Sequence, residues 1–353
     1  MEDCIKRNQT KKIKVGDIFI GGDSPISVQS MTNTDTRDVK ATIHQIKSLE
    51  EAGCDIVRLA ILDNEAATAI GEIKKHVKIP LVADIHYDYR LAVECMKNGV
   101  DKIRLNPGNI GGNDRVRTVA GMAKERGIPI RIGVNSGSVE KRILEKFGGV
   151  TAEGMVESAL AHVAMLENVD FNDIAISIKA SSVPMTIAAY RLLSEKCLYP
   201  LHVGVTEAGT VYKGTIKSAV GIGCLLAEGI GDTIRVSLTG DPVEEIKVGK
   251  QILKSLDLLK EGIEIVSCPT CGRTQVNLID IANSIEPLLE KLNKNIKVAI
   301  MGCAVNGPGE AKDADIGIAG GVNEVLLFKK GRIIRKIPQE NVVEELIKEI
   351  SEM

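Results

Sequence analysis

The sequence has few aromatic side chains and almost no net charge. None of its 353 residues is Trp and only 3% are aromatic, so a stacking surface for single-stranded nucleic acid is not expected. The net charge of −2 argues against nucleic acid or an anionic membrane surface as the main partner. No apolar run approaches the roughly 20 residues that span a bilayer, and Met1–Lys14 is polar and lysine-rich without an apolar signal region. These absences predict a cytosolic protein.

Eight cysteines are present, and in a reducing compartment they are expected to be thiols or metal ligands rather than disulfides. Five occur singly and are predicted to be small buried apolar side chains: Cys4, Cys54, Cys95, Cys197 and Cys224. The other three lie in two motifs, Cys268-Pro269-Thr270-Cys271-Gly272-Arg273 and Cys303-Ala304-Val305-Asn306-Gly307-Pro308-Gly309-Glu310. A Cys-x-x-Cys turn projects two thiolates toward one metal centre, and a third thiol from another loop adds a third ligand.

The fourth ligand position has no cysteine nearby, and Glu310 is the obvious local candidate. Zinc and iron–sulfur clusters both suit thiolate ligands. A structural zinc site is normally closed by four Cys or His side chains, but no His follows His202. Three thiolates with one exchangeable oxygen ligand favour an iron–sulfur cluster that keeps one iron for substrate. Structural zinc and a redox dithiol remain the alternatives.

Short apolar runs alternate with amphipathic helices eight times, which is typical of a (β/α)8 barrel of the TIM type. We predict this barrel for residues 1–256, with a small hairpin at Lys12–Ile20 closing its bottom. A doubly wound open sheet is the alternative, but no Gly-x-Gly-x-x-Gly follows the first strand. The predicted strands are Ile26–Ser30, Ile56–Ile61, Leu81–Ile85, Lys102–Asn106, Ile128–Asn135, Ile174–Lys179, Leu201–Thr206 and Thr233–Leu238.

From residue 257 to 353 the pattern changes to that of a small α+β domain. Its loops carry the three clustered cysteines. The predicted elements are strand Ile263–Ser267, helix Asn277–Leu292, strands Lys297–Met301 and Ile316–Ile318, hairpin Val325–Ile337 and helix Val342–Ile350.

Polar residues stand at the predicted strand ends, where barrels of this type build their active sites. A cation among Val, Ile and Leu costs several kcal/mol unless it is paired, so a ring of them predicts a bound anion. Arginine matches phosphate oxygens bidentately, and a diphosphate is therefore the natural ligand. Pairing with Asp84 or Glu207 is the alternative for any single cation. The predicted binding residues are Arg58, Asp84, His86, Arg104, Asn106, Arg131, Asn135, Lys179, His202 and Arg235.

Several of these residues have two possible roles. Glu207, in the turn after the seventh strand, is placed for general acid catalysis, or it pairs with Lys179 or Arg235. His86 and His202 are proton donors, or they orient and pack. Asn135 holds a phosphate or caps a turn.

With barrel and cysteine motifs together, the sequence resembles the bacterial 4-hydroxy-3-methylbut-2-enyl diphosphate synthase family of the methylerythritol phosphate pathway. The resemblance covers nearly the whole chain, and the sequence is similar to the two-domain form of the family. Its most specific motifs are Asp84-Ile85-His86, Lys102–Gly108, Gly133–Ser138, His202–Gly209, Ser267–Arg273 and Gly302–Glu310.

The resemblance implies a 4Fe–4S cluster on Cys268, Cys271, Cys303 and Glu310. It implies the substrate 2-C-methyl-D-erythritol 2,4-cyclodiphosphate, whose ring is opened and reduced with electrons from flavodoxin or ferredoxin. It also implies a homodimer in which the cluster domain of one subunit caps the barrel of the other. On this basis Glu207 is the expected proton donor, and Asn306 the expected hydrogen-bond donor near the open iron.

Two rival functions remain at this stage. One is a non-redox barrel enzyme, such as a transferase on a phosphorylated or pterin substrate, with a zinc-stabilised tail. The other is an electron carrier or binding module whose barrel is only a scaffold. The ring of strand-end cations and the carboxylate at the fourth ligand position both argue against them.

Overall fold

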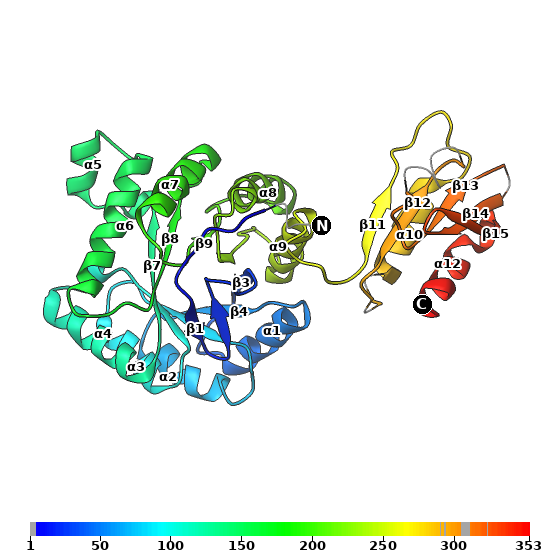
Figure 1. Cartoon of the computed structure of the whole chain (residues 1–353). Coiled ribbons are helices and arrows are strands. Elements are labelled where there is room, and N and C mark those ends of the chain that lie inside the picture. The colour runs from blue at the N-terminus through cyan, green and yellow to red at the C-terminus, as the bar shows by residue number, and fades with distance from the viewer. Residues whose placement is uncertain (1–4, 290, 293, 305–310, 323) are drawn as a thin grey trace. The chain divides into compact units, whose positions relative to one another are not determined.

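The structure, a computed structural model, describes residues 5–289, 291–292, 294–304, 311–322 and 324–353. The chain divides into two compact units, Met1–Leu258 and Leu259–Met353. Each unit is described by itself below (Figure 1).

The first unit is a barrel of eight parallel strands, as the sequence predicts. The strands hydrogen-bond in the order β8-β7-β6-β5-β4-β3-β10-β9, and a parallel bridge between Ile176 and Leu201 joins the two ends. Near-continuous Val, Ile and Leu runs suit strands that are covered on both sides. The bounds are β3 (Ser27–Met31), β4 (Ile56–Ala60), β5 (Leu81–Asp84), β6 (Lys102–Arg104), β7 (Ile130–Asn135), β8 (Ile174–Lys179), β9 (His202–Val203) and β10 (Thr233–Ile234).

Helices surround the barrel in the predicted alternation (Figure 1). They begin at capping side chains such as Asp38, Asp63 and Asp88, whose carboxylates accept backbone N–H groups of the first turn. The helices are α1 (Val39–Glu51), α2 (Asn64–Ile73), α3 (Tyr89–Lys97), α4 (Asn113–Arg126), α6 (Ala152–Glu167), α7 (Val183–Lys196), α8 (Val211–Ala227) and α9 (Pro242–Ser255).

One helix of this unit was not predicted, α5 (Lys141–Phe147). It has only seven residues, four of them charged, and no side chain caps its N-terminus. It is therefore too short to show a clear apolar face, and it lacks the capping side chain that marks the start of helices such as α1, α2 and α3.

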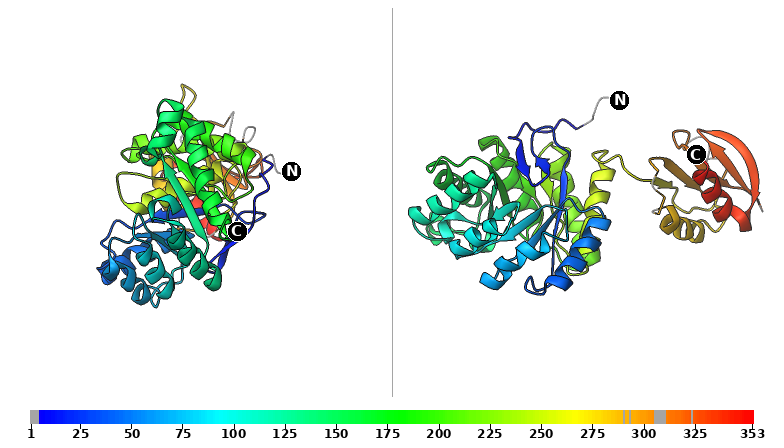
Figure 2. Two further views of the ribbon diagram at one scale, coloured as in Figure 1. Left: turned by 90° about the vertical axis from the view of Figure 1, so that its left-hand side faces the viewer. Right: turned by 90° about the horizontal axis from the view of Figure 1, so that it is seen from below.

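The predicted hairpin is present as β1 (Ile13–Val15) paired with β2 (Ile18–Ile20). Its buried side chains pack against Ile56, Val82 and Ala175, near the beginnings of barrel strands. The hairpin therefore covers the N-terminal end of the barrel and leaves the other end for the site (Figure 2).

The second unit is a five-stranded sheet covered on one face by two helices. The strand order is β11-β12-β13-β14-β15, in which the first three strands are parallel and the last two antiparallel to their neighbours. Its main core joins both helices to β12, β13 and β14. The bounds are β11 (Glu264–Ser267), α10 (Leu278–Leu289), β12 (Lys297–Met301), β13 (Ile316–Gly320), β14 (Glu324–Lys329), β15 (Arg332–Pro338) and α12 (Val342–Ser351).

Within the described residues, no helix is long and apolar enough to cross a membrane.

Candidate active site

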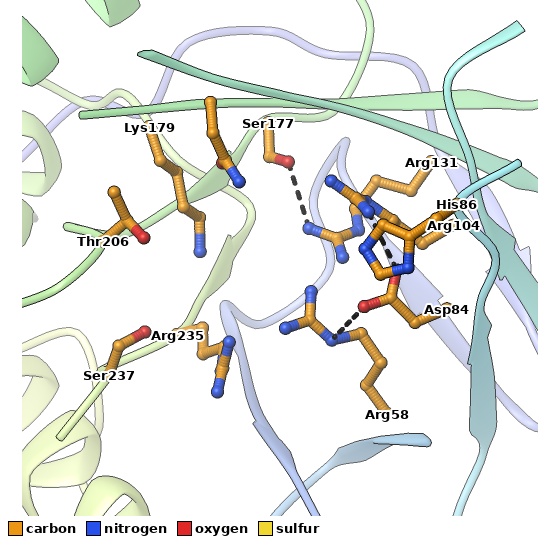
Figure 3. A pocket seen from close by; sticks show the side chains of 11 residues that line it. Arg58, Asp84, His86, Arg104, Arg131, Ser177, Lys179, Thr206, Arg235 and Ser237 are labelled. Carbon is orange, nitrogen blue, oxygen red and sulfur yellow. Dashed lines mark hydrogen bonds and ion pairs between the residues drawn. The ribbon is translucent and has the colours of Figure 1, made fainter. Parts of the chain in front are cut away.

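A polar pocket opens where the barrel strands end (Figure 3). Side chains from β4, β5, β6, β7 and β8, and from the segments that follow β5, β9 and β10, point into the same space. The lining residues are Arg58, Asp84, His86, Arg104, Arg131, Asn135, Ser177, Lys179, Thr206, Arg235 and Ser237.

Parallel register brings these side chains side by side. Asp84 lies opposite Arg104, Arg104 lies opposite Arg131, and Asn135 lies opposite Lys179. Alternate residues of a strand point to the same side, so Arg104 follows Lys102 into the barrel interior. The pocket thus follows from strand pairing rather than from a long loop.

Asp84 is the shared partner of two arginines. Its Oδ1 accepts a hydrogen bond from Arg104 Nη1 at 3.0 Å, and its Oδ2 lies 3.6 Å from Arg58 Nε. Burial alone would raise the pKa of the Asp84 carboxyl, but Arg58 and Arg104 outweigh it and hold that pKa below its ordinary value. Asp84 is therefore a buried carboxylate that fixes both guanidinium groups.

The backbone of Gly133 holds the next two side chains. Its carbonyl oxygen accepts from Arg104 Nη2 at 2.9 Å and from Asn106 Nδ2 at 3.0 Å, while its N–H donates to Asn106 Oδ1 at 2.9 Å. A side chain at position 133 would come within 2.6 Å of Arg104 Nε, so glycine is required for this approach. Gly204 does the same for Lys179, whose Nζ would lie 2.8 Å from an added Cβ.

The remaining cations have fewer carboxylate partners. Arg131 is buried and donates to the Ser177 hydroxyl at 3.0 Å. Burial and the neighbouring cations hold the pKa values of Arg131 and Lys179 well below their ordinary values. The pKa of Arg58 is also lowered, to about 9, first by burial and then by the neighbouring Arg235.

Arg235 approaches the other buried carboxylate of this region. Its Nε lies 3.8 Å from Glu245 Oε2, and Glu245 also accepts from the Ser30 hydroxyl and the Leu238 N–H. Among the described residues, five pocket cations thus face two carboxylates, Asp84 and Glu245. This excess of positive charge suits a compact, multiply charged anion.

Most of the predicted binding residues line the pocket, but two described ones, Asn106 and His202, do not, and neither does the predicted catalytic acid Glu207. Asn106 is buried with its amide bound to Gly133, and His202 is buried below the lining. Glu207 is exposed, one residue beyond Thr206, with a left-handed backbone (φ 51°) that is rare for a non-glycine residue and is typical of functional turns. Asn306 and Glu310 lie outside the described residues.

Sequence reasoning missed Ser177, Thr206 and Glu245. Ser177 shares the parity of Lys179 and could have been found from strand alternation. Glu245 comes from α9, and nothing in its local sequence indicates that this one carboxylate of the helix is buried.

The clustered cysteines gather at one edge of the second unit. Cys268 directly follows β11 and Cys303 lies two residues beyond β12, and these two strands are parallel neighbours. The Gly302 N–H donates to Cys268 Sγ at 3.1 Å, and the Gln275 N–H donates to the Gly302 carbonyl at 3.0 Å. The two cysteine-bearing loops are therefore joined by hydrogen bonds.

Cys271 is the exposed member of the three. Hydrogen bonds from the Arg273 backbone and side chain lower the pKa of its thiol, which favours the thiolate form that binds metals. Over the described part of the chain, no three His, Cys, Asp or Glu side chains stand together in metal-binding geometry. The soft donors at one edge nevertheless fit the chemistry of an iron–sulfur or zinc site.

The other cysteines match the prediction only in part. Cys54 and Cys95 are buried, but Cys197 and Cys224 are only half-buried, since they lie at the C-terminal ends of surface helices. Cys4 is outside the described residues.

Together, fold and site define a TIM-barrel protein with a cation-rich pocket at its strand ends and a separate thiol-bearing α+β unit. Family models match both parts, the GcpE TIM-barrel domain over residues 10–250 and the GcpE protein C-terminal domain over residues 264–352. The chain belongs to the GcpE family.

Curated relatives match over the full length. A protein of Clostridium acetobutylicum is 65% identical over 99% of this chain and 100% of its own. One of Geobacillus thermodenitrificans is 58% identical over 100% of this chain and 94% of its own. Both are named 4-hydroxy-3-methylbut-2-en-1-yl diphosphate synthase (flavodoxin).

Among solved structures, a type I 3-dehydroquinate dehydratase from Clostridium difficile is similar with a TM-score of 0.52. It covers 70% of this chain and 98% of its own at 14% identity, and therefore supports the barrel fold alone.

Proposed function

We propose that this protein is an oxidoreductase that opens and reduces 2-C-methyl-D-erythritol 2,4-cyclodiphosphate to 4-hydroxy-3-methylbut-2-enyl diphosphate in isoprenoid precursor synthesis. The observation that carries the proposal is the excess of five cations over two carboxylates at the barrel mouth of a full-length GcpE family member. The named relatives support the reaction, and the pocket supports a doubly anionic ring as its substrate.

The barrel residues bind and orient the diphosphate. Arginine offers paired N–H groups that match phosphate oxygens, and partner contacts already fix the Arg58, Arg104 and Arg131 side chains in the empty pocket. Substrate then replaces water without a large ordering cost. The proposed diphosphate-binding residues are Arg58, Arg104, Arg131, Lys179 and Arg235, with Asp84, His86, Asn106, Asn135, His202 and Asn306 contacting the substrate or positioning these groups.

The proposed cofactor is a 4Fe–4S cluster held by Cys268, Cys271, Cys303 and Glu310. The position of Cys268 and Cys303 after two neighbouring parallel strands, a backbone N–H on Cys268 Sγ and the lowered pKa of Cys271 support soft-metal binding there. When bound, such a cluster supplies electrons one at a time and a Lewis-acidic iron.

Glu207 is the proposed source of the proton that the reaction consumes. Overall, two electrons and one proton convert the cyclic diphosphate to the open-chain diphosphate and water. Glu207 follows Thr206, which lines the pocket, and its carboxyl is the proposed donor to the departing oxygen.

The proposed partners are flavodoxin or ferredoxin as electron donor and a second copy of the chain in a homodimer. The relatives' printed names support flavodoxin. A cytoplasmic location is part of the proposal because a reducing compartment keeps the clustered thiols available.

The test is purification of the full chain without air, followed by iron and sulfide analysis and turnover of the cyclic diphosphate with reduced flavodoxin. We expect a coloured protein with about four irons per chain that releases the open-chain diphosphate. A colourless, zinc-containing protein without turnover would refute the proposal. Sedimentation analysis of the same sample tests the homodimer.

A further inference from the structure

Below the pocket, the barrel interior contains polar groups that have no partner within the described chain. Both amide atoms of Gln29, the Nζ of Lys102 and both ring nitrogens of His202 are buried without a hydrogen bond, as are Nε and Nη2 of Arg131. The apolar layer of Ile56, Val82 and Ala175, sealed by the hairpin, lies at the N-terminal end of the same barrel. The interior is therefore polar between an apolar floor and a cationic mouth.

Lys102 is the unusual member of this group. It is fully buried, and it lies two residues before Arg104 on β6, so both side chains point into the barrel. The two buried carboxylates nearby are already engaged, Asp84 by Arg58 and Arg104, and Glu245 by Arg235 and two further donors. Among the described residues, Lys102 has no ion pair or hydrogen bond.

If Lys102 were protonated, it would add a sixth cation to the five that line the pocket, while the described residues of this region provide two buried carboxylates, Asp84 and Glu245. An unpaired buried charge costs several kcal/mol, and a lysine escapes this cost by losing its proton. Burial first, and then Arg131 and Arg58, lower the pKa of Lys102 to about 7. Without an anion beside it, Lys102 therefore loses its proton far more readily than an exposed lysine.

We propose that Lys102 takes up a proton from solvent when a phosphorylated dianion enters the barrel mouth, and so becomes a buried counter-charge beneath the bound ligand. The identity of the ligand as the cyclic diphosphate rests on the proposed function; the uptake itself depends on the charge of the ligand. Lys102 is a positioning residue in this proposal, because it acts through the field in the barrel.

The sign of the effect follows from linkage. With the mouth empty, Lys102 loses its proton as pH rises through about 7, whereas a nearby dianion favours the ammonium form and raises its pKa. We therefore expect proton uptake to increase as pH rises through about 7, and affinity for the dianion to fall over the same range. The cyclic diphosphate carries only strongly acidic protons, so it does not titrate in this range.

Other charged groups face the same interior and can compete for the proton. They are Arg58 from β4, Asp84 from β5 with His86 beyond it, Arg104 from β6, Arg131 from β7, Lys179 from β8, His202 from β9, Arg235 after β10 and Glu245 from α9. Burial, the first cause, lowers the pKa of His202 well below its ordinary value, so its ring stays neutral. Lys179 is the main competitor, because its pKa is also lowered and it lines the pocket.

The experiment is titration calorimetry of the full chain, purified without air, with the cyclic diphosphate in buffers of different ionisation enthalpy. The dependence of the binding enthalpy on the buffer gives the number of protons taken up. In Lys102→Met, which keeps the approximate length of the side chain and removes the amine, we expect proton uptake at about pH 8 to fall to less than a third, and the pH dependence of affinity to weaken accordingly. The matched control is Lys97→Met, which removes an exposed lysine of α3 and should take up protons as the unaltered protein does.

Two outcomes would overturn the proposal. Absence of proton uptake in the unaltered protein near pH 8 refutes it, whether or not the Lys102 variant folds. Full uptake in Lys102→Met assigns the proton to another group, such as Lys179, and refutes it equally.

Sulfate, a dianion that does not titrate near neutral pH, separates this proposal from the proposed function. Sulfate affinity that falls above pH 7 in the unaltered protein, but not in Lys102→Met, supports Lys102 even if the cyclic diphosphate does not bind. Turnover of the cyclic diphosphate without any proton uptake on binding leaves the function intact and refutes the role of Lys102.

Discussion

The barrel mouth and the cysteine edge of the second unit are built in opposite ways. The mouth carries its functional groups mainly on strands, buried and cross-linked through Asp84 and Gly133. The cysteine edge carries its thiols on loops, with Cys303 buried, Cys268 half-buried and Cys271 exposed, and backbone N–H groups of Gly302 and Gln275 donate the hydrogen bonds between these loops. The mouth is thus prearranged by the fold, whereas the edge provides donors that a metal centre would draw together.

This difference shows where binding energy and binding-site order come from. Strand register fixes the distance between Arg104 and Arg131 before any ligand arrives. Loop-borne thiolates gain their order from the metal they bind, as is general for metal sites in small domains. Substitutions at the mouth should therefore change ligand affinity, whereas substitutions at the edge should change cofactor content.

The largest effect is expected at the edge. Cys303→Ser removes a soft ligand from a proposed three-thiol site, so iron and sulfide content and turnover should both fall to background. Metal analysis and turnover on protein purified without air measure this. Cys224→Ser, on the half-buried α8 cysteine, is the control and should keep both. A Cys303 variant with full iron content would remove the contrast between the two regions.

The next effect separates chemistry from binding at the mouth. Glu207→Gln keeps the size of the side chain but removes the acid, so kcat should fall by about a hundredfold or more. Calorimetric affinity for the cyclic diphosphate and the iron content should stay unchanged. The control is Glu195→Gln on the exposed surface of α7. Unaltered kcat in Glu207→Gln would exclude Glu207 as the proton donor.

A smaller effect is expected when Arg104, one of the two arginines held by Asp84, is replaced. Arg104→Met leaves Asp84 with a single partner and removes a phosphate ligand, so affinity should fall about a hundredfold and unfolding free energy by about 3 kcal/mol. Titration calorimetry and denaturant unfolding measure the two quantities. Arg37→Met breaks an exposed pair with Asp35 and should change neither. Loss of iron with unchanged affinity in Arg104→Met would contradict the assignment of the mouth to binding.

The smallest effect tests whether Asn106 positions or binds. Asn106→Leu removes the side-chain acceptor of the Gly133 N–H and one of the two side-chain donors to the Gly133 carbonyl, since Arg104 still donates to that carbonyl; this should cost about 2 kcal/mol of unfolding free energy. Affinity should drop only several-fold, because Arg104 keeps its Asp84 contact. Asn64→Leu, on an exposed helix start, serves as control. A drop in affinity as large as that of Arg104→Met would make Asn106 a direct ligand of the substrate.

The sequence predicted the barrel because short, largely apolar runs alternate with helices, several of which begin at a capping Asp or Ser and end near a Gly. Strand parity also predicted most of the mouth, since Arg104 and Arg131 occupy inward positions in adjacent parallel strands. Local pattern could not reveal partner choice. Nothing near Asn106 indicates that Gly133, on the next strand, takes both ends of its amide.

Two features depended on tertiary packing and were out of reach. Glu245 is one of several acidic residues at the start of α9, and only its packing against β3 and β10 buries it. Lys102 begins a predicted strand, where a lysine commonly reaches solvent. In the closed barrel the Lys102 side chain points inward. The sequence alone does not show that, among the described residues, its Nζ has no carboxylate partner.

The small hairpin of β1 and β2 has a consequence for traffic through the molecule. Because the hairpin covers the N-terminal end of the barrel, the pocket at the strand ends is a shared route for substrate, product, water and protons. A ligand bound in this pocket separates the buried polar interior of the barrel from solvent. We therefore expect water and protons to exchange with the buried interior more slowly while a ligand occupies the pocket.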